Sequence, residues 1–143
     1  MNALFSQFQT NPELERNGVR VEYLSDDEEA NKKPPAFIIA RAGGSNVAYD
    51  TMMDQRLKPL RRRIQAENVS NKELEKITRE VFIATVLKGW ENVTDAKGEV
   101  IPFSANAAEE LFKSLPDLYE DLRAQSNKMS LFRAANVEAA AKN

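Results

Sequence analysis

The sequence predicts a mainly helical α+β fold, with a single helical domain, an N-terminal antiparallel β-hairpin and a second short β-hairpin near residues 90–103. Apolar residues recur at helical spacing over most of the chain, which indicates packed helices. Two short segments near the N-terminus instead carry the pattern of strands. A length of 143 residues fits one domain. We place that domain at residues 1–135 and expect residues 136–143 to form a frayed C-terminal tail.

The N-terminal hairpin is predicted from two strand-like segments and the polar stretch between them. Apolar and charged side chains alternate along GVRVEYL, residues 18–24, as in a half-buried strand. AFIIARA, residues 36–42, is the second candidate strand. The intervening residues 25–35 contain four consecutive acids, two lysines and two prolines, so we expect an exposed loop at the tip of the hairpin.

A helix is predicted after Gly43-Gly44, where Ser45 or Asn46 can act as the N-cap. Spacings of four, four, three and four residues place a set of apolar side chains on one face of that helix. The members of this set are Tyr49, Met53, Leu57, Leu60 and Ile64. Pro59 lies within the pattern and predicts a kink or break near Lys58.

The most apolar helix follows Ser70-Asn71-Lys72-Glu73, which has the form of a capping box. Its apolar residues cover most of its girth, as expected for a central helix, and Gly89 is its predicted end. Next, WENV and EVIPF flank the turn TDAKG and predict the second hairpin.

Ser104 is the predicted N-cap of the next helix. Pro116 ends that helix, and a last helix starts near Asp117 and continues past Phe132.

Composition excludes several classes of active site. The chain has no histidine and no cysteine, so Ser-His-Asp and Cys-His arrangements are impossible and no thiolate can bind zinc. We therefore expect a protein that is not an enzyme and that needs no metal or cofactor.

The net charge of -2 favours neither nucleic acid nor an anionic membrane as a partner. The N-terminal segment lacks the features of a secretory signal, and no apolar run approaches the ~20 residues that span a bilayer. We expect the cytoplasm as the location.

Three charged or glycine-rich motifs each have a functional and a structural interpretation. Residues 41–46, RAGGSN, lie between a strand and a helix, where phosphate loops occur, but the signature of such loops is missing and a tight turn is favoured. Lys58 and residues 61–63 form a basic cluster that could contact nucleic acid or an acidic protein; a solvated helix face is favoured. Residues 26–29 are four acids without the ligand spacing of a calcium loop.

Surplus apolar residues in the C-terminal third suggest a partner-binding surface, with core packing as the alternative. Trp90 stands at a helix-to-hairpin corner opposite Phe103, and the last helix carries apolar residues beyond one narrow stripe. The predicted partner contacts are Trp90, Phe103, Leu118, Tyr119, Leu122, Met129 and Phe132.

The order of these features resembles the tail assembly chaperones of long-tailed, siphovirus-type bacteriophages. The matching text runs through PELERNGVRVEY, FIIARAGGSN with YDTMMDQRLKPLRRRI, and LKGWENVTDAKGEVIPFSANAAEELFKSLPDLYEDL. The likeness covers roughly residues 3–133, and it lies in the ordered set rather than in any single motif.

The resemblance implies a non-enzymatic protein that binds the tape measure protein and keeps it soluble until the tail tube grows around it. The tail tube protein is a further candidate partner, self-association is expected, and the mature virion should lack the chaperone. Many members have a longer form made by ribosomal frameshifting. Residues 141–143, Ala-Lys-Asn, are compatible with a slippery codon run, which reading the gene would test.

Two other functions remain open from the sequence. A structural head–tail joining or tail-completion protein would stay in the purified particle, unlike a chaperone. A small nucleic-acid-binding regulator would use Lys58 and residues 61–63 and would be retained on DNA at moderate salt.

Overall fold

Three strands form one antiparallel sheet in the order β1-β2-β3 in the computed structural model, which describes residues 3–134. Their bounds are Val19–Glu22 for β1, Ala36–Ile39 for β2 and Leu87–Glu91 for β3. Val21 pairs with Phe37, and Phe37 pairs with Trp90, so these three side chains share the face that packs against the core. The sequence alternation in β1 is therefore the signature of a sheet covered on one face only.

The other face of the sheet carries polar side chains. Arg20 Nε lies 3.1 Å from Glu91 Oε2 and its guanidinium also pairs with Glu22, so one arginine spans from β1 to β3. Ile38 of β2 lies between Arg20 and Gly89 on this face, and a Cβ at Gly89 would meet open space. No layer is needed here because the charged groups are solvated.

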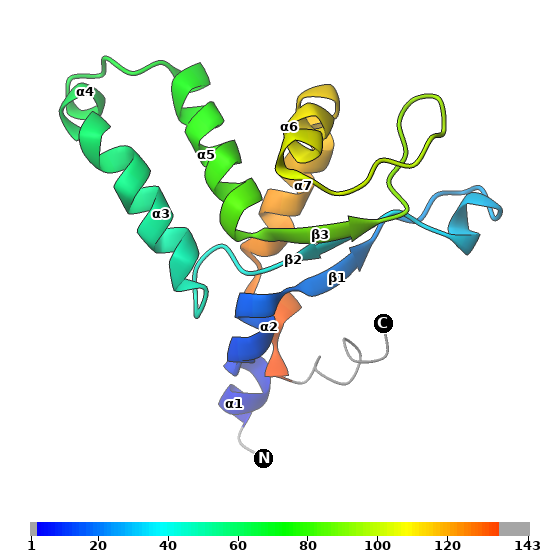
Figure 1. Cartoon of the computed structure of the whole chain (residues 1–143). Helices are drawn as coiled ribbons and strands as arrows, with labels where there is room; N and C mark the ends of the chain where they lie inside the picture. The colour runs from blue at the N-terminus through cyan, green and yellow to red at the C-terminus, as the bar shows by residue number, and fades with distance from the viewer. Residues whose placement is uncertain (1–2, 135–143) are drawn as a thin grey trace.

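Helices cover one face of the sheet (Figure 1). In Figure 1, α5, α6 and α7 cluster on one side of the sheet, α3 and α4 form an arm beside α5, and α1 and α2 lie near the start of β1. The α-helices are α1 (Ala3–Phe8), α2 (Pro12–Asn17), α3 (Val47–Leu57), α4 (Arg61–Gln65), α5 (Asn71–Thr85), α6 (Ala105–Ser114) and α7 (Pro116–Ser126). Short 3₁₀ turns are η1 (Ala30–Lys32), η2 (Lys58–Leu60) and η3 (Met129–Phe132). Among the described residues, no helix is long and apolar enough to cross a membrane.

The core is built around α5, whose apolar side is the widest in the chain. Phe82 lies edge-on to Phe112 of α6 and Tyr119 of α7, with ring centroids 6.1 and 5.5 Å apart. Val81 and Val86 are fully buried beside it. Edge-to-face aromatic contacts of this kind fix the relative positions of three helices.

The predicted fold class is confirmed, and the helix caps predicted at Ser70 and Ser104 form. Ser70 Oγ accepts a hydrogen bond from Glu73 N at 3.1 Å, and Ser104 Oγ accepts one from Ala107 N at 3.0 Å. The break predicted at Pro59 is η2. The second hairpin differs in detail, because its first arm, β3, joins the main sheet and the arms of the turn share only the bridge between Thr94 and Val100.

The predicted ends of two helices are wrong. The central helix stops at Thr85, not at Gly89, because the residues after Val86 pair with β2 instead. Backbone pairing with a buried strand outweighs helical periodicity here. The last helix stops at Ser126, so Met129 and Phe132 lie on η3 and do not share one helix face with Leu118 and Leu122.

Residues 3–17 fold into two short helices although they carry no strong sequence pattern. Asn11 caps α2 by accepting hydrogen bonds from Glu13 N at 2.8 Å and Leu14 N at 3.3 Å, with Pro12 at the first helical position. Asn11 N also donates to Phe132 O at 2.9 Å, which joins the two ends of the described chain. The domain bounds 1–135 stay a prediction, and the predicted tail 136–143 lies outside the described residues.

Candidate functional site

Four of the seven predicted partner contacts lie in the core. Trp90, Tyr119, Leu122 and Phe132 are buried, the last two with no exposed surface. Core packing alone accounts for their apolar character, and in this conformation they present almost nothing to a partner. Their role in partner binding stays a prediction.

Trp90 instead positions the turn that follows β3. Its Nε1 donates a hydrogen bond to Ile101 O at 2.8 Å, and its ring lies edge-on to Phe37 and Phe103 at centroid distances of 5.9 and 5.1 Å. Trp90 therefore helps to hold this turn, residues 93–101, against the sheet, together with Val93, which is itself buried in the core.

The other three predicted contacts are partly accessible. Phe103 is 39% exposed and covers the Trp90 ring. Met129 is half-buried in η3. Leu118, at the start of α7, is half-buried and lines a surface groove, so it is the one predicted contact that lies in a concave site.

The apolar groove lies between the turn after β3, the tip of the β1–β2 hairpin and the corner between α6 and α7. Its first hollow has a volume of about 280 Å³. A second hollow of about 410 Å³ continues along α6 and shares Thr94, Leu111 and Leu115 with the first. The first hollow is lined by Tyr23, Pro35, Phe37, Val93, Thr94, Leu111, Leu115 and Leu118. A concave surface of this composition is typical of binding sites for apolar groups.

One wall of the groove is a turn organised by Asp95. Its Oδ1 accepts hydrogen bonds from Lys97 N and Glu99 N, both at 2.9 Å, and Gly98 has a φ of 83° that favours glycine. Ile101 N donates to Val93 O at 2.8 Å and closes the base. The turn that was predicted from TDAKG therefore forms one wall of the groove.

The opposite wall is the corner between α6 and α7. Pro116 cannot continue α6 and occupies the first turn of α7, while Leu115 between the helices has a φ of -126° and a ψ of 71°. This backbone turns Leu115 outward, where it is 50% exposed at the rim. A leucine left half in water at a concave site is a candidate contact.

Carboxylates surround the groove. Asp95 and Glu110 are among the residues that line its second hollow. Asp121 lies one helical turn beyond Leu118 and accepts hydrogen bonds from Tyr23 Oη at 2.6 Å and Gln125 Nε2 at 2.8 Å. The bond from Tyr23, with that from Gln125, holds the pKa of Asp121 below its usual value of 3.8. Burial raises the pKa of Tyr23, and the neighbouring Asp121 raises it further.

The other side of α6 has a different character. There, a cleft between α5 and α6 is crossed by an ion pair between Arg79 and Glu109 at 2.7 Å, and Lys113 approaches the same carboxylate at 3.9 Å. Lys76 and Glu80 also line this cleft. Arg79 and Glu109 thus pair across the two helices, whereas Glu80 pairs with Arg56 of α3.

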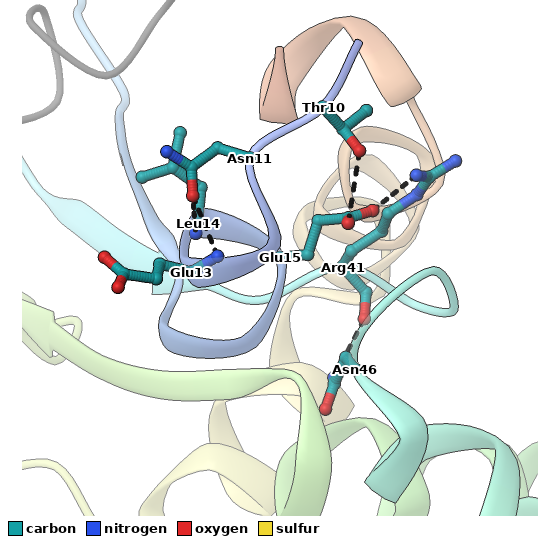
Figure 2. A network of polar contacts seen from close by, with 7 residues as sticks. All are labelled: Thr10, Asn11, Glu13, Leu14, Glu15, Arg41 and Asn46. Atoms are coloured by element: carbon teal, nitrogen blue, oxygen red, sulfur yellow. Dashed lines mark hydrogen bonds and ion pairs between the residues drawn. The ribbon is translucent and has the colours of Figure 1, made fainter. Parts of the chain in front are cut away.

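The glycine-rich turn after β2 is occupied by a carboxylate of the protein itself (Figure 2). Glu15 is buried, and its Oε2 accepts a hydrogen bond from Arg41 Nη1 at 2.5 Å while Oε1 accepts one from Thr10. Any Cβ at Gly44 would overlap Glu15 Oε2. The place where a phosphate would bind is thus already filled, which favours the structural interpretation of RAGGSN.

Hydrogen bonds also decide the pKa of Glu15 and the role of Asn46. Burial alone would raise the pKa of Glu15, but the bonds from Arg41, Ser45 and Thr10 outweigh it and hold the pKa below its usual value of 4.5. Asn46 makes no cap bond, contrary to prediction; its Nδ2 donates to Arg41 O and Thr85 O. The turn is therefore fastened to α2 and to the end of α5.

The basic cluster is partly neutralised by ion pairs. Arg61 pairs with Asp54, and Arg63 lies 3.1 Å from Glu73, which fastens α4 to α5. This favours a solvated structural face. As for the acidic loop, no group of three or more possible metal-ligating side chains occurs within residues 3–134.

A comparison with known families identifies the origin of the chain. A family model described as YdaY prophage protein matches residues 44–143. The chain belongs to the YdaY prophage protein family. The protein is therefore phage-derived. The part of the chain that matches the YdaY family includes the turn after β3 and both helices that line the groove, whereas Tyr23, Pro35 and Phe37 precede it. No curated protein and no solved structure matches the chain.

The sequence reasoning missed most of the residues that line the groove. Val93 and Pro35 are far apart in the sequence, and only the pairing of three strands brings them together. Leu115 carried a local signal, because a leucine directly before a helix-starting proline lies outside both helices.

Proposed function

We propose that this prophage protein is a tail assembly chaperone that binds the tape measure protein and keeps it soluble during tail assembly. The observation that carries the proposal is the apolar groove beside α6, with Leu115 half exposed at its rim. Membership of a prophage family supports a role in the phage life cycle. The ordered likeness to tail assembly chaperones supplies the specific partner.

The chemistry of the groove fits a stoichiometric binding role rather than catalysis. A long helical chain that exposes apolar stripes aggregates unless those stripes are covered. A groove lined by apolar side chains covers such a stripe, and burial of a few side chains gives a modest affinity that allows release when the tube grows.

The proposal is tested by co-expression with the longest open reading frame downstream in the same prophage. We expect that frame's product to be soluble with the wild-type chain and mostly insoluble alone. Leu115→Ser removes the rim leucine but keeps a side chain compatible with the start of α7, and it should reduce the soluble fraction several-fold.

The matched control is Val47→Ser on α3, because Val47 is also exposed and lies outside the groove. It should leave the soluble fraction unchanged. The proposal fails if the product is equally soluble without the chain. If Leu115→Ser and Val47→Ser give the same soluble fraction, the groove is not the binding site.

Purified particles separate the chaperone from a head–tail joining or tail-completion protein. We expect mass spectrometry of mature virions to find the tail tube and tape measure proteins without this chain. Its presence at stoichiometric levels would favour the structural alternative.

A further inference from the structure

The charged side chains that line the apolar groove are both acidic, although Lys128 lies close enough to the nearby Asp121 to help lower its pKa. Asp95 and Glu110 line it, and neither forms an ion pair with another described residue. Asp121 stands next to Tyr23, where it accepts hydrogen bonds but likewise has no ion-pair partner among residues 3–134. No lysine or arginine lines either hollow. Lys97 is on the same turn as Asp95 but is absent from the lining.

Three cations lie on the other side of α6. Arg79 and Lys113 approach Glu109 there, and Lys76 lines the same cleft. The helix thus separates a cleft that contains an ion pair between helices from a groove whose carboxylates have no ion-pair partner among residues 3–134. Unpaired charges at the rim of an apolar site raise the association rate and select partners of opposite charge.

The walls of the groove favour a helix over an extended segment as the occupant. An extended peptide binds through backbone hydrogen bonds to a free strand edge. Here the turn uses its own backbone groups, since Asp95 N donates to Glu99 O and Ile101 N donates to Val93 O. The helical wall presents side chains. A helix satisfies its own backbone groups and needs only an apolar stripe to dock.

We propose that the apolar groove binds an amphipathic helix of another chain whose apolar stripe is flanked by lysine or arginine. This rests on the proposed function and names the kind of tape measure segment that is recognised. The apolar stripe fills the hollows between the turn and the α6–α7 corner, and the flanking cations meet Asp95, Glu110 and Asp121. Segments of the same hydrophobicity flanked by acids are rejected by like-charge repulsion.

The test uses the full chain and two synthetic helical peptides with the same leucine stripe, one flanked by lysines and one by glutamates. Fluorescence anisotropy of the labelled peptides should show about tenfold tighter binding of the lysine peptide at low ionic strength. That preference should fall in high salt, because exposed charges are screened.

Glu110→Gln should reduce the preference two- to threefold, whereas Glu75→Gln, which changes an exposed acid of the α5–α6 cleft, should leave it unchanged. Equal binding of both peptides overturns the charge rule, and so does a preference that Glu110→Gln leaves at its wild-type size. Binding of neither peptide overturns the inference.

The proposed function has its own criterion in the co-expression experiment, so the two can fail separately. If the chain keeps the tape measure product soluble yet binds neither peptide, only the present inference is lost. A second copy of the chain is the remaining candidate occupant, and sedimentation of the chain alone tests it. If the chain forms a dimer that Leu115→Ser abolishes, the groove binds a second copy and the inference is overturned.

Discussion

The two sides of α6 illustrate two ways for a small protein to use the surface next to its core. On the α5 side, Arg79 of α5 forms an ion pair with Glu109 of α6, and Lys113 approaches the same carboxylate from one turn along α6. On the opposite side, Leu115 is half exposed above an apolar hollow and Glu110 points to solvent without an ion-pair partner among the described residues. The ion pair on the first side forms within the monomer. On the second side, the exposed apolar surface of Leu115 and the carboxylate of Glu110 are available to a partner.

This difference points to a candidate binding surface on the side of α6 where apolar surface and carboxylates have no partner among the described residues. Ion pairs that close on themselves contribute little to stability and offer little to a partner. Apolar side chains left at the rim of a concave site lose contact with water only when a partner covers them. The groove side is therefore the candidate for binding, and the α5 side is the internal control.

The largest expected effect comes from the side chain that holds the groove wall in place. Trp90→Ala should lower the free energy of unfolding by about 3–5 kcal/mol, because it removes a buried aromatic and leaves Ile101 O without its donor. Chemical denaturation followed by circular dichroism measures the change. A loss below about 1 kcal/mol would show that the turn is held by other contacts.

Breaking the ion pair on the control side should cost less and leave binding intact. Arg79→Met should lower the free energy of unfolding by about 1 kcal/mol, since both partners are near the surface and Glu109 keeps Lys113 nearby. Binding of the lysine-flanked peptide should not change. A large loss of binding in this variant would contradict the division between the two sides of α6.

Removing the hydroxyl of Tyr119 should slightly raise the free energy of unfolding, in contrast to the two preceding substitutions. Its oxygen is buried between α5, α6 and α7 and has no hydrogen-bond partner within the described residues, and burial raises its pKa to about 12. Tyr119→Phe should therefore stabilise the protein by about 1 kcal/mol, because an unsatisfied buried hydroxyl carries a desolvation cost. A loss of stability would indicate a hidden partner for that oxygen.

Tyr23→Phe is the matched change at the groove and should have the smallest effect on stability. Removing its hydrogen bond should raise the pKa of Asp121 towards 3.8, which carboxyl NMR titration measures. Because the pKa of Asp121 is lowered by folding, its contribution is present above the unfolded-state pKa and is lost as the pH falls through the folded-state value. The wild-type protein should thus lose slightly more stability than Tyr23→Phe on acidification below about pH 4. An unchanged Asp121 pKa would contradict the role of Tyr23.

Local signals in the sequence predicted the parts of the fold that depend on neighbours along the chain. The caps at Ser70 and Ser104 and the break at Pro59 each act through residues within one turn. The helix predicted to reach Gly89 failed because β2 competes for the backbone after Val86. No periodicity within the segment reports that competition.

The candidate site was harder to predict for a related reason. Apolar residues look alike in the sequence whether they fill the core or face a partner. Tyr119 and Leu122 are buried, whereas Leu118 on the same helix lines the groove. Which of them remains accessible depends on where β3 and its turn pack against α6 and α7, and that is a tertiary property.

Amide hydrogen exchange of the chain with and without the proposed partner, the tape measure protein, tests most directly which side of α6 binds. We predict slowed exchange in residues 93–101 and around the α6–α7 corner, with no change in the first two turns of α5. Protection confined to the α5–α6 cleft or to the α3–α4 arm, with residues 93–101 unchanged, would contradict the assignment of the groove as the binding site.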